Sequence, residues 1–158
     1  MSDTELHQLL AENAIRRLIS AYCDAVNRLD ADAAGPLFTP AARIRIAGFP
    51  ELVGREAITE GMRQTFAASE FLHQHCDTGL IDVDGDHAFS RLSVFELNRK
   101  PGADDIGMII GTYEDEYVRL AEGWRFAVRR YTLTLRTLLP PSKIQQVPGF
   151  VPERDFRA

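Results

Sequence analysis

The sequence predicts an α+β fold, because helical patterns occupy its first part and strand patterns occupy the part after about residue 70. Between residues 14 and 26, apolar side chains recur every three or four residues, which is the spacing of one buried helix face. After residue 70, strand-like segments are separated by short turns that contain Gly and Asp. Helices first and a meandering sheet second favour a curved sheet folded over the long first helix.

The first part of the chain carries several start signals for helices. Ser2 or Thr4 can cap a short opening helix, and Glu5 stands three residues after Ser2, as in a capping box. The main amphipathic helix follows from Ala14, with Ile15, Leu18, Ile19, Tyr22 and Val26 on its buried face. Residues 30–34 read as a second helix start that leads into a short helix or turn at 35–38, and residues 43–46 alternate as a half-buried strand. A further helix opens at residues 54–58 and presents Ile58, Met62 and Phe66 on one side.

The second part of the chain reads as strand after strand. Residues 73–83 and 87–97 are joined by Asp84-Gly85-Asp86, which favours a hairpin. Residues 100–105 form a loop, and 108–120 and 124–138 form a further strand pair around residues 121–123. The tail at 140–158 is too rich in proline for a helix or a central strand. We expect the tail either to pack on a neighbouring subunit or over a pocket mouth, or to be a loosely held terminus.

Composition limits the class of protein. With 158 residues, 45% hydrophobic and 26% charged, the chain fits one domain over residues 1–158. A net charge of -5 without runs of like charge argues against nucleic acid and against an anionic membrane surface, and favours a small-molecule partner. Cys23 and Cys76 suggest reduced thiols in a cytoplasmic protein, because a chain of this size needs no disulfide framework. The start of the chain has no signal-peptide pattern, and no apolar run is long enough to span a bilayer.

The last strands carry apolar groups on both faces. Trp124, Phe126 and Val128 share one face by alternation, while Tyr131 and Leu133 belong to the other. A sheet in a small monomer normally exposes one face to water. We therefore expect a homodimer or homotrimer that forms through the outer sheet face.

Two histidines stand in one of the more apolar parts of the chain. In a strand, His73 and His75 lie on the same face, and histidine moves protons readily near neutral pH. A His-x-His pair can also bind a metal ion, but spacing fixes no third ligand, since His87 lies beyond the turn. We expect no metal and no cofactor.

A set of spaced residues over 8–138 resembles the SnoaL-like branch of the nuclear transport factor 2-like superfamily. It comprises Ile15 to Tyr22, Asn27, Asp30, Leu37-Phe38, Val53 to Ile58, the 82–86 hairpin and Gly123 to Phe126. The resemblance implies a cone-shaped roll, with a strongly curved mixed or antiparallel sheet around N-terminal helices and a deep apolar pocket. This superfamily includes lyases, isomerases and cyclases, binding domains without catalysis, and small subunits of ring-hydroxylating dioxygenases, so the fold alone assigns no function.

The resemblance also implies a catalytic site, nearest in pattern to hexachlorocyclohexane dehydrochlorinase and scytalone dehydratase. In that pattern a strand histidine abstracts a proton and matches His75, and a helix aspartate that holds it is replaced here by Asn27. Arg129, five residues after Trp124, matches an arginine on the last strand, and Tyr22 matches the oxyanion-binding tyrosine of ketosteroid isomerase. An asparagine can orient an imidazole but supplies no negative charge, which weakens the base.

Each of these residues also has a structural interpretation. In this interpretation, His75 is a pocket histidine whose hydrogen bonds are satisfied, and Tyr22 is a core aromatic residue. Arg129 is the ion-pair partner of Glu114, Asp115 or Glu116. The expected pocket lining is His73, Ile46, Phe49, Phe71, Phe95 and Tyr131. The sequence therefore predicts a cofactor-independent lyase or isomerase, of the dehydratase, dehydrohalogenase or cyclase type, acting on a small apolar or cyclic molecule. The alternatives are a non-catalytic small-molecule-binding domain and a dioxygenase small subunit.

Overall fold

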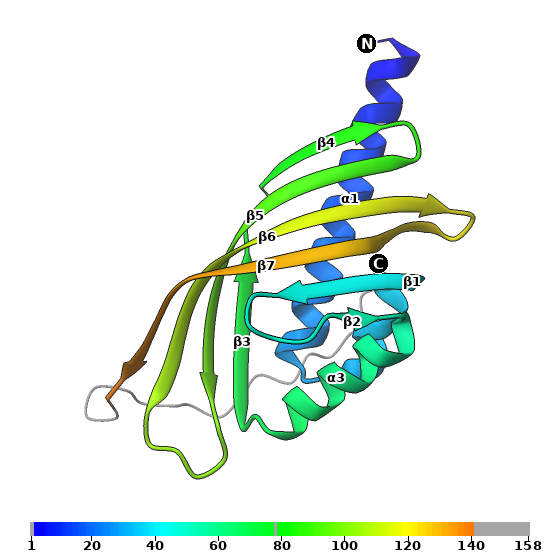
Figure 1. Ribbon diagram of the computed structural model, residues 1–158. Coiled ribbons are helices and arrows are strands. Elements are labelled where there is room, and N and C mark those ends of the chain that lie inside the picture. The colour runs from blue at the N-terminus through cyan, green and yellow to red at the C-terminus, as the bar shows by residue number, and fades with distance from the viewer. Residues whose placement is uncertain (1, 78, 141–158) are drawn as a thin grey trace.

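The computed structural model describes residues 2–77 and 79–140 (Figure 1). The predicted tail at 140–158 therefore lies outside the described residues, apart from its first position. Helix α1 (Asp3–Asn27) is one continuous helix, so the separate opening helix that the sequence predicts is wrong. Ser2 accepts a hydrogen bond from the Glu5 N–H and Glu5 accepts one from the Ser2 N–H, which confirms the capping box. The predicted apolar face of α1 is buried.

The shorter helices follow the start signals in the sequence. Asp30 caps α2 (Ala31–Ala34) through the Ala33 N–H, and a 3₁₀ turn, η1 (Gly35–Leu37), follows directly. Helix α3 (Arg55–Ala67) buries the predicted side, because its buried residues are Ile58, Met62 and Phe66. None of the helices in the described residues is long and apolar enough to cross a membrane.

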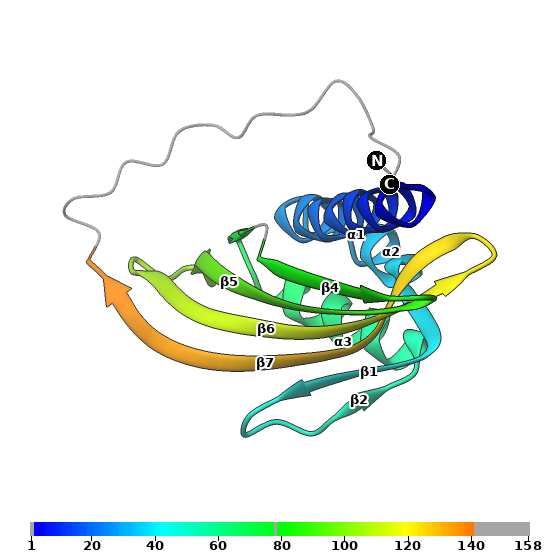
Figure 2. The ribbon, with the colours of Figure 1, turned by 90° about the horizontal axis from the view of Figure 1, so that it is seen from above.

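The strands form one curved mixed sheet that does not close into a barrel. They are β1 (Phe38–Ile46), β2 (Leu52–Val53), β3 (Phe71–Cys76), β4 (Leu80–Asp84), β5 (His87–Arg99), β6 (Ile106–Leu120) and β7 (Gly123–Leu139). The order is β2-β1-β7-β6-β5-β3, with β4 also paired to β5. The β1–β7 pair is parallel and the others are antiparallel. Figures 1 and 2 show the long strands bending beside α1 and α3, which confirms the α+β cone.

The single strand predicted at 73–83 is two strands in the structure. Both β3 and β4 pair with β5, and the chain leaves the first pairing at Asp77, whose side chain accepts a hydrogen bond from the Ser93 N–H at 3.0 Å. Gly79 has φ +52°, and a Cβ there would meet the Arg91 carbonyl oxygen. Alternation of apolar residues cannot reveal this break, because both halves alternate.

A bulge in β7 decides which side chains enter the interior. Tyr117 pairs with Phe126 and Glu116 pairs with Val128, so Ala127 is an extra residue on β7. Because one residue is inserted, Arg129 follows Phe126 on the inner face instead of facing outward. The simple alternation expected for this strand is therefore wrong after residue 126, and the bulge carries a charged side chain into the core.

Candidate functional site

A cavity of about 220 Å³ lies inside the cone, between the helices and the inner face of the sheet. Its apolar wall comprises Val26, Ile44, Ile46, Leu52, Met62, Phe66, Leu72 and Ile109. Its polar side chains are Tyr22, Thr65, Gln74, Glu96, Tyr113, Arg129 and Tyr131. An apolar pocket with a few convergent polar groups is the usual form of a small-molecule site.

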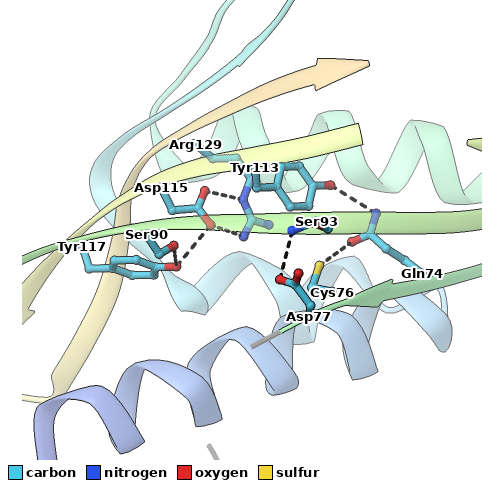
Figure 3. A network of polar contacts seen from close by, with 9 residues as sticks. All are labelled: Gln74, Cys76, Asp77, Ser90, Ser93, Tyr113, Asp115, Tyr117 and Arg129. Atoms are coloured by element: carbon cyan, nitrogen blue, oxygen red, sulfur yellow. Dashed lines mark hydrogen bonds and ion pairs between the residues drawn. The ribbon is translucent and has the colours of Figure 1, made fainter. Parts of the chain in front are cut away.

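The strongest electrostatic feature beside this cavity is a buried ion pair (Figure 3). Arg129 donates from Nε to Asp115 Oδ1 at 2.8 Å and from Nη2 to Asp115 Oδ2 at 2.7 Å. The two side chains are 1% and 0% exposed. The hydroxyl of Tyr117 donates to Asp115 at 3.2 Å and lies 2.8 Å from the Ser90 hydroxyl. Of the three carboxylates that the sequence offers to Arg129, the structure selects Asp115.

Arg129 keeps one donor group unused. Its guanidinium lies among aromatic rings, 3.9 Å from the ring centroid of Tyr113, 4.2 Å from that of Tyr22 and 4.3 Å from that of Phe126. Among the described residues, Nη1 of Arg129 is buried without a hydrogen-bond partner. A buried donor without a partner is costly, so Nη1 has unused capacity to donate to an acceptor atom.

The protonation states around the cavity follow from burial and from the ion pair. Burial by itself would lower the pKa of Arg129, but the Asp115 carboxylate outweighs it and holds that pKa well above its ordinary value. Burial raises the pKa of Tyr22, with the Arg129 cation acting in the opposite direction. Burial also raises the pKa of Tyr113 well above its ordinary value, and the neighbouring Tyr22 adds to this. Arg129 is therefore a cation and both tyrosines are neutral phenols at physiological pH.

Gln74 supplies the polar group that β3 directs into the cavity. Its Nε2 donates to Glu96 Oε2 at 3.0 Å and to the Tyr113 hydroxyl at 3.1 Å (Figure 3 shows the second contact). Glu96 also accepts a hydrogen bond from Asn98 Nδ2 at 2.8 Å. Neither Gln74 nor Glu96 is among the site residues predicted from the sequence. Each, however, stands in the inward row of its strand, with Leu72 on β3 and with Leu92 and Val94 on β5.

Asn27 has a different role from the predicted one. Its Oδ1 accepts from the Gln74 N–H at 2.6 Å, and its Nδ2 donates to the Gln74 carbonyl at 3.1 Å. The structure has no hydrogen bond from Asn27 to the His75 ring, so that prediction is wrong; both amide atoms bond instead to the backbone of the preceding residue. A carboxylate could not satisfy both groups, since it has no donor for the carbonyl. The asparagine thus joins the end of α1 to β3.

His73 and His75 lie on one face of β3, as the alternation predicts, but it is the exposed face. Together with Asn27 they line a groove of about 350 Å³ between α1 and β3, outside the cone cavity. The expected grouping of His75 and Arg129 in one pocket is therefore corrected. The reason is the alternation itself: with Leu72 and Gln74 turned inward, the neighbouring histidines must turn outward.

Some of the other predicted site residues line the cavity, and some do not. Tyr22, Ile46 and Tyr131 line the cavity with Arg129. Phe49 is 71% exposed near the β1–β2 turn, Phe95 is 38% exposed, and Phe71 is half-buried; none of the three lines the cavity. Their predicted place in the pocket is wrong, because a large apolar side chain in a strand is compatible with either face of the sheet.

Both cysteines line the outer groove, Cys23 from α1 and Cys76 from β3, and both are free thiols. Hydrogen bonding to Cys76 lowers the pKa of Cys23 to about 7, against the opposing effect of burial. The same contact, together with burial, raises the pKa of Cys76. Within residues 2–77 and 79–140, no three His, Cys, Asp or Glu side chains are grouped so that they could hold a metal ion.

The chain is similar to known proteins in sequence and in fold. A family model described as a SnoaL-like domain matches residues 7–130. A hexachlorocyclohexane dehydrochlorinase (LinA) of type 2 has a TM-score of 0.81 and 18% identity, over 93% of this chain and 99% of its own. A provisionally assigned scytalone dehydratase from Novosphingobium aromaticivorans has a TM-score of 0.77 and 22% identity, over 92% of this chain and 100% of its own. Curated protein sequences gave no significant match. At these identities the solved structures support the fold alone.

Proposed function

Since the chain belongs to the SnoaL-like domain family, we propose that its cone cavity binds a small apolar or cyclic molecule and acts on it as a cofactor-independent lyase or isomerase. One observation carries this proposal. In a cavity with a largely apolar wall, the buried cation of Arg129 has no hydrogen-bond partner for Nη1 among residues 2–77 and 79–140. A ligand with one oxygen function would satisfy this donor while its hydrocarbon part fills the apolar space.

The fixed cation suits a reaction in which negative charge develops on that oxygen. Asp115 holds Nε and Nη2 of Arg129, so the guanidinium needs no reorganisation when charge appears near Nη1. Tyr22 lines the same cavity as a neutral phenol and can donate to the same oxygen. Proton abstraction next to a carbonyl, and elimination from that position, both place negative charge on an oxygen.

The size of the cavity limits the substrate. A volume of about 220 Å³ is below the range of drug-sized pockets, which is roughly 300–1,000 Å³. The ligand is therefore compact, with one or two rings and few polar groups.

A second candidate function is non-catalytic binding of the same class of molecule. It is favoured by the side chains that face the cavity, because no histidine lines it in the described part of the chain. In this case Arg129 and Tyr22 would recognise a ligand oxygen without any turnover.

The binding proposal is tested with two ligands that differ only in one oxygen, 2-naphthol and naphthalene. We expect 2-naphthol to raise the Tm of the protein progressively with concentration. Naphthalene should bind at least about tenfold more weakly, because a hydrogen bond to a charged group contributes about 1.5–3 kcal/mol. His75→Ala is the matched control, since it changes the outer groove and should leave both affinities unchanged. Equal binding of the two ligands would overturn the role of Arg129, and no binding of 2-naphthol would overturn the cavity assignment.

A further inference from the structure

We propose that the carboxylate of Glu96 is the base that removes the substrate proton in this cavity, and that Gln74 is its positioning residue. The inference rests on the proposed function, which supplies the ligand and the developing oxyanion. It replaces the histidine base that the family resemblance implied, because the structure places His75 on the outside of β3.

Glu96 occupies an unusual place in its strand. The inward row of β5 is buried at Ala88, Ser90, Leu92 and Val94, and Glu96 continues that row where it reaches the cavity. Among the described residues that line the cavity, it is the one carboxylate. A charged side chain in an otherwise inward-facing row needs a reason, because desolvating a carboxylate is costly.

Two hydrogen bonds fix the orientation of the Glu96 carboxylate. Oε2 accepts from Gln74 and Oε1 accepts from Asn98, and both donors are neutral amides. No ion pair involves Glu96 in the described part of the chain, so its charge is not neutralised by a neighbouring cation. Each oxygen retains a lone pair for a proton. Asp115 is different, because both of its oxygens accept from Arg129 and one also accepts from Tyr117.

The anion and the cation are both connected to Tyr113. Gln74 Nε2 joins Glu96 to the Tyr113 hydroxyl, and the Arg129 guanidinium lies 3.9 Å from the Tyr113 ring centroid. Tyr131 lines the same cavity; burial raises the pKa of Tyr131 to about 12, and the negative charge of Glu96 adds to that rise. A small ligand in the cavity thus meets a proton acceptor, Glu96, and an oxyanion site, Arg129 with Tyr22, in the lining of one cavity.

The chemical step balances without an oxidant or a reductant. A C–H bond next to a ligand carbonyl breaks, and its proton passes to an oxygen of Glu96. The electron pair of that bond forms a carbon–carbon double bond, and the carbonyl π electrons move to its oxygen, beside Arg129 and Tyr22. In a ligand with a carbon–carbon double bond between its β and γ carbons, return of the proton to the γ carbon re-forms the carbonyl and completes an isomerisation. Departure of a leaving group on the neighbouring carbon, with its electron pair, completes an elimination.

The test uses 2-tetralone, whose carbonyl activates the neighbouring C1 protons, in D₂O with NMR detection of exchange at C1. We expect the wild-type protein to accelerate exchange above the buffer rate. Glu96→Gln should reduce this acceleration about 100-fold or more. Its affinity for 2-naphthol, an aromatic analogue of the 2-tetralone enol, should change less than about threefold, because the oxygen site is intact. Glu116→Gln, on the outer side of β6, is the matched control and should exchange like wild type.

Gln74 is tested by separating kcat from KM. Gln74→Leu removes the donor to Glu96 but keeps a side chain of similar size. We expect a lower kcat for exchange with KM nearly unchanged, because the carboxylate loses its orientation while the binding surface remains. A general structural defect would instead lower the melting temperature and raise KM.

The outcomes separate this inference from the proposed function. If the wild-type protein does not bind 2-naphthol, the proposed function fails. If it binds 2-naphthol but does not accelerate exchange, or if Glu96→Gln exchanges as fast as wild type, the cavity assignment stands and the role of Glu96 is overturned.

Discussion

Asp115→Asn should strongly destabilise the protein, because it leaves the Arg129 cation buried without a counter-charge. The two side chains are 1% and 0% exposed, and their two hydrogen bonds measure 2.8 and 2.7 Å. Solvent therefore screens little of the interaction. Removing one partner of such a pair costs about 3–5 kcal/mol of unfolding free energy, since the remaining charge stays desolvated.

The same two strands provide the matched control. Arg130 and Glu116 form an ion pair at 2.6 Å, but their side chains are 40% and 33% exposed. Exposed pairs contribute about 0–1 kcal/mol, so Glu116→Gln should cost less than about 1 kcal/mol. The two variants make the same kind of change on β6, and they differ in burial.

Urea denaturation followed by the fluorescence of Trp124, the single and buried tryptophan, measures both values. The double variant Asp115→Leu with Arg129→Met should be less destabilised than Asp115→Asn, because it leaves no unpaired charge. If Asp115→Asn and Glu116→Gln lose similar stability, the assignment of a desolvated ion pair to the core would be refuted.

Three further predictions concern other parts of the molecule. Asn27→Ala should lower the unfolding free energy by about 1–3 kcal/mol, because two hydrogen bonds to the β3 backbone are lost. Asp24→Ala, on the exposed side of α1, should cost less than about 1 kcal/mol in the same urea titration. The rate of Cys23 alkylation by iodoacetamide, followed by mass spectrometry, should rise with pH around a midpoint of about 7. Cys76→Ala should move that midpoint upward, because the hydrogen bond that favours the Cys23 thiolate is lost. An unchanged midpoint would contradict the hydrogen bond between the two cysteines. Phe89 is 51% exposed on the outer face of the sheet, and we propose that a homo-oligomer forms through this face. Phe89→Ser should then reduce the mass of the particle measured by light scattering. A monomeric wild-type protein would contradict the proposal.

The sequence predicted the helices well because their signals are local. The capping box at Ser2, the helix start at residues 30–34 and the apolar side of α3 depend on local signals, and the structure confirms each. Helix periodicity also identifies the buried face directly, since the apolar residues gather on one side.

The strands were harder to predict because a period of two defines two faces but does not say which of them is buried. On β3 the choice lay between the row of His73 and His75 and the row of Leu72 and Gln74, and packing against α1 decided it. On β7 the inserted Ala127 changed the inward row from even to odd residues. No pattern in β7 alone marks that insertion, because it is defined by pairing with β6.

The candidate site was therefore predicted in part. The structure brings Tyr22, Arg129, Ile46 and Tyr131 to one cavity, as expected for residues on three separate elements of a cone. The residue that faces them from β3 is Gln74, whereas the family resemblance implies its neighbour His75. A polar residue inside an inward apolar row is the signal that could have identified Gln74 and Glu96.

In the proposed function, the cone cavity binds the ligand, and the outer groove with the two histidines does not. Titration of the protein with 2-naphthol, followed by NMR of methyl groups and histidine rings, tests this directly. We predict shifts of the Met62, Ile44 and Leu72 methyl signals, which belong to cavity residues, with His73 and His75 ring signals unchanged. Shifts of the histidine rings without shifts of the cavity methyl groups would contradict the account.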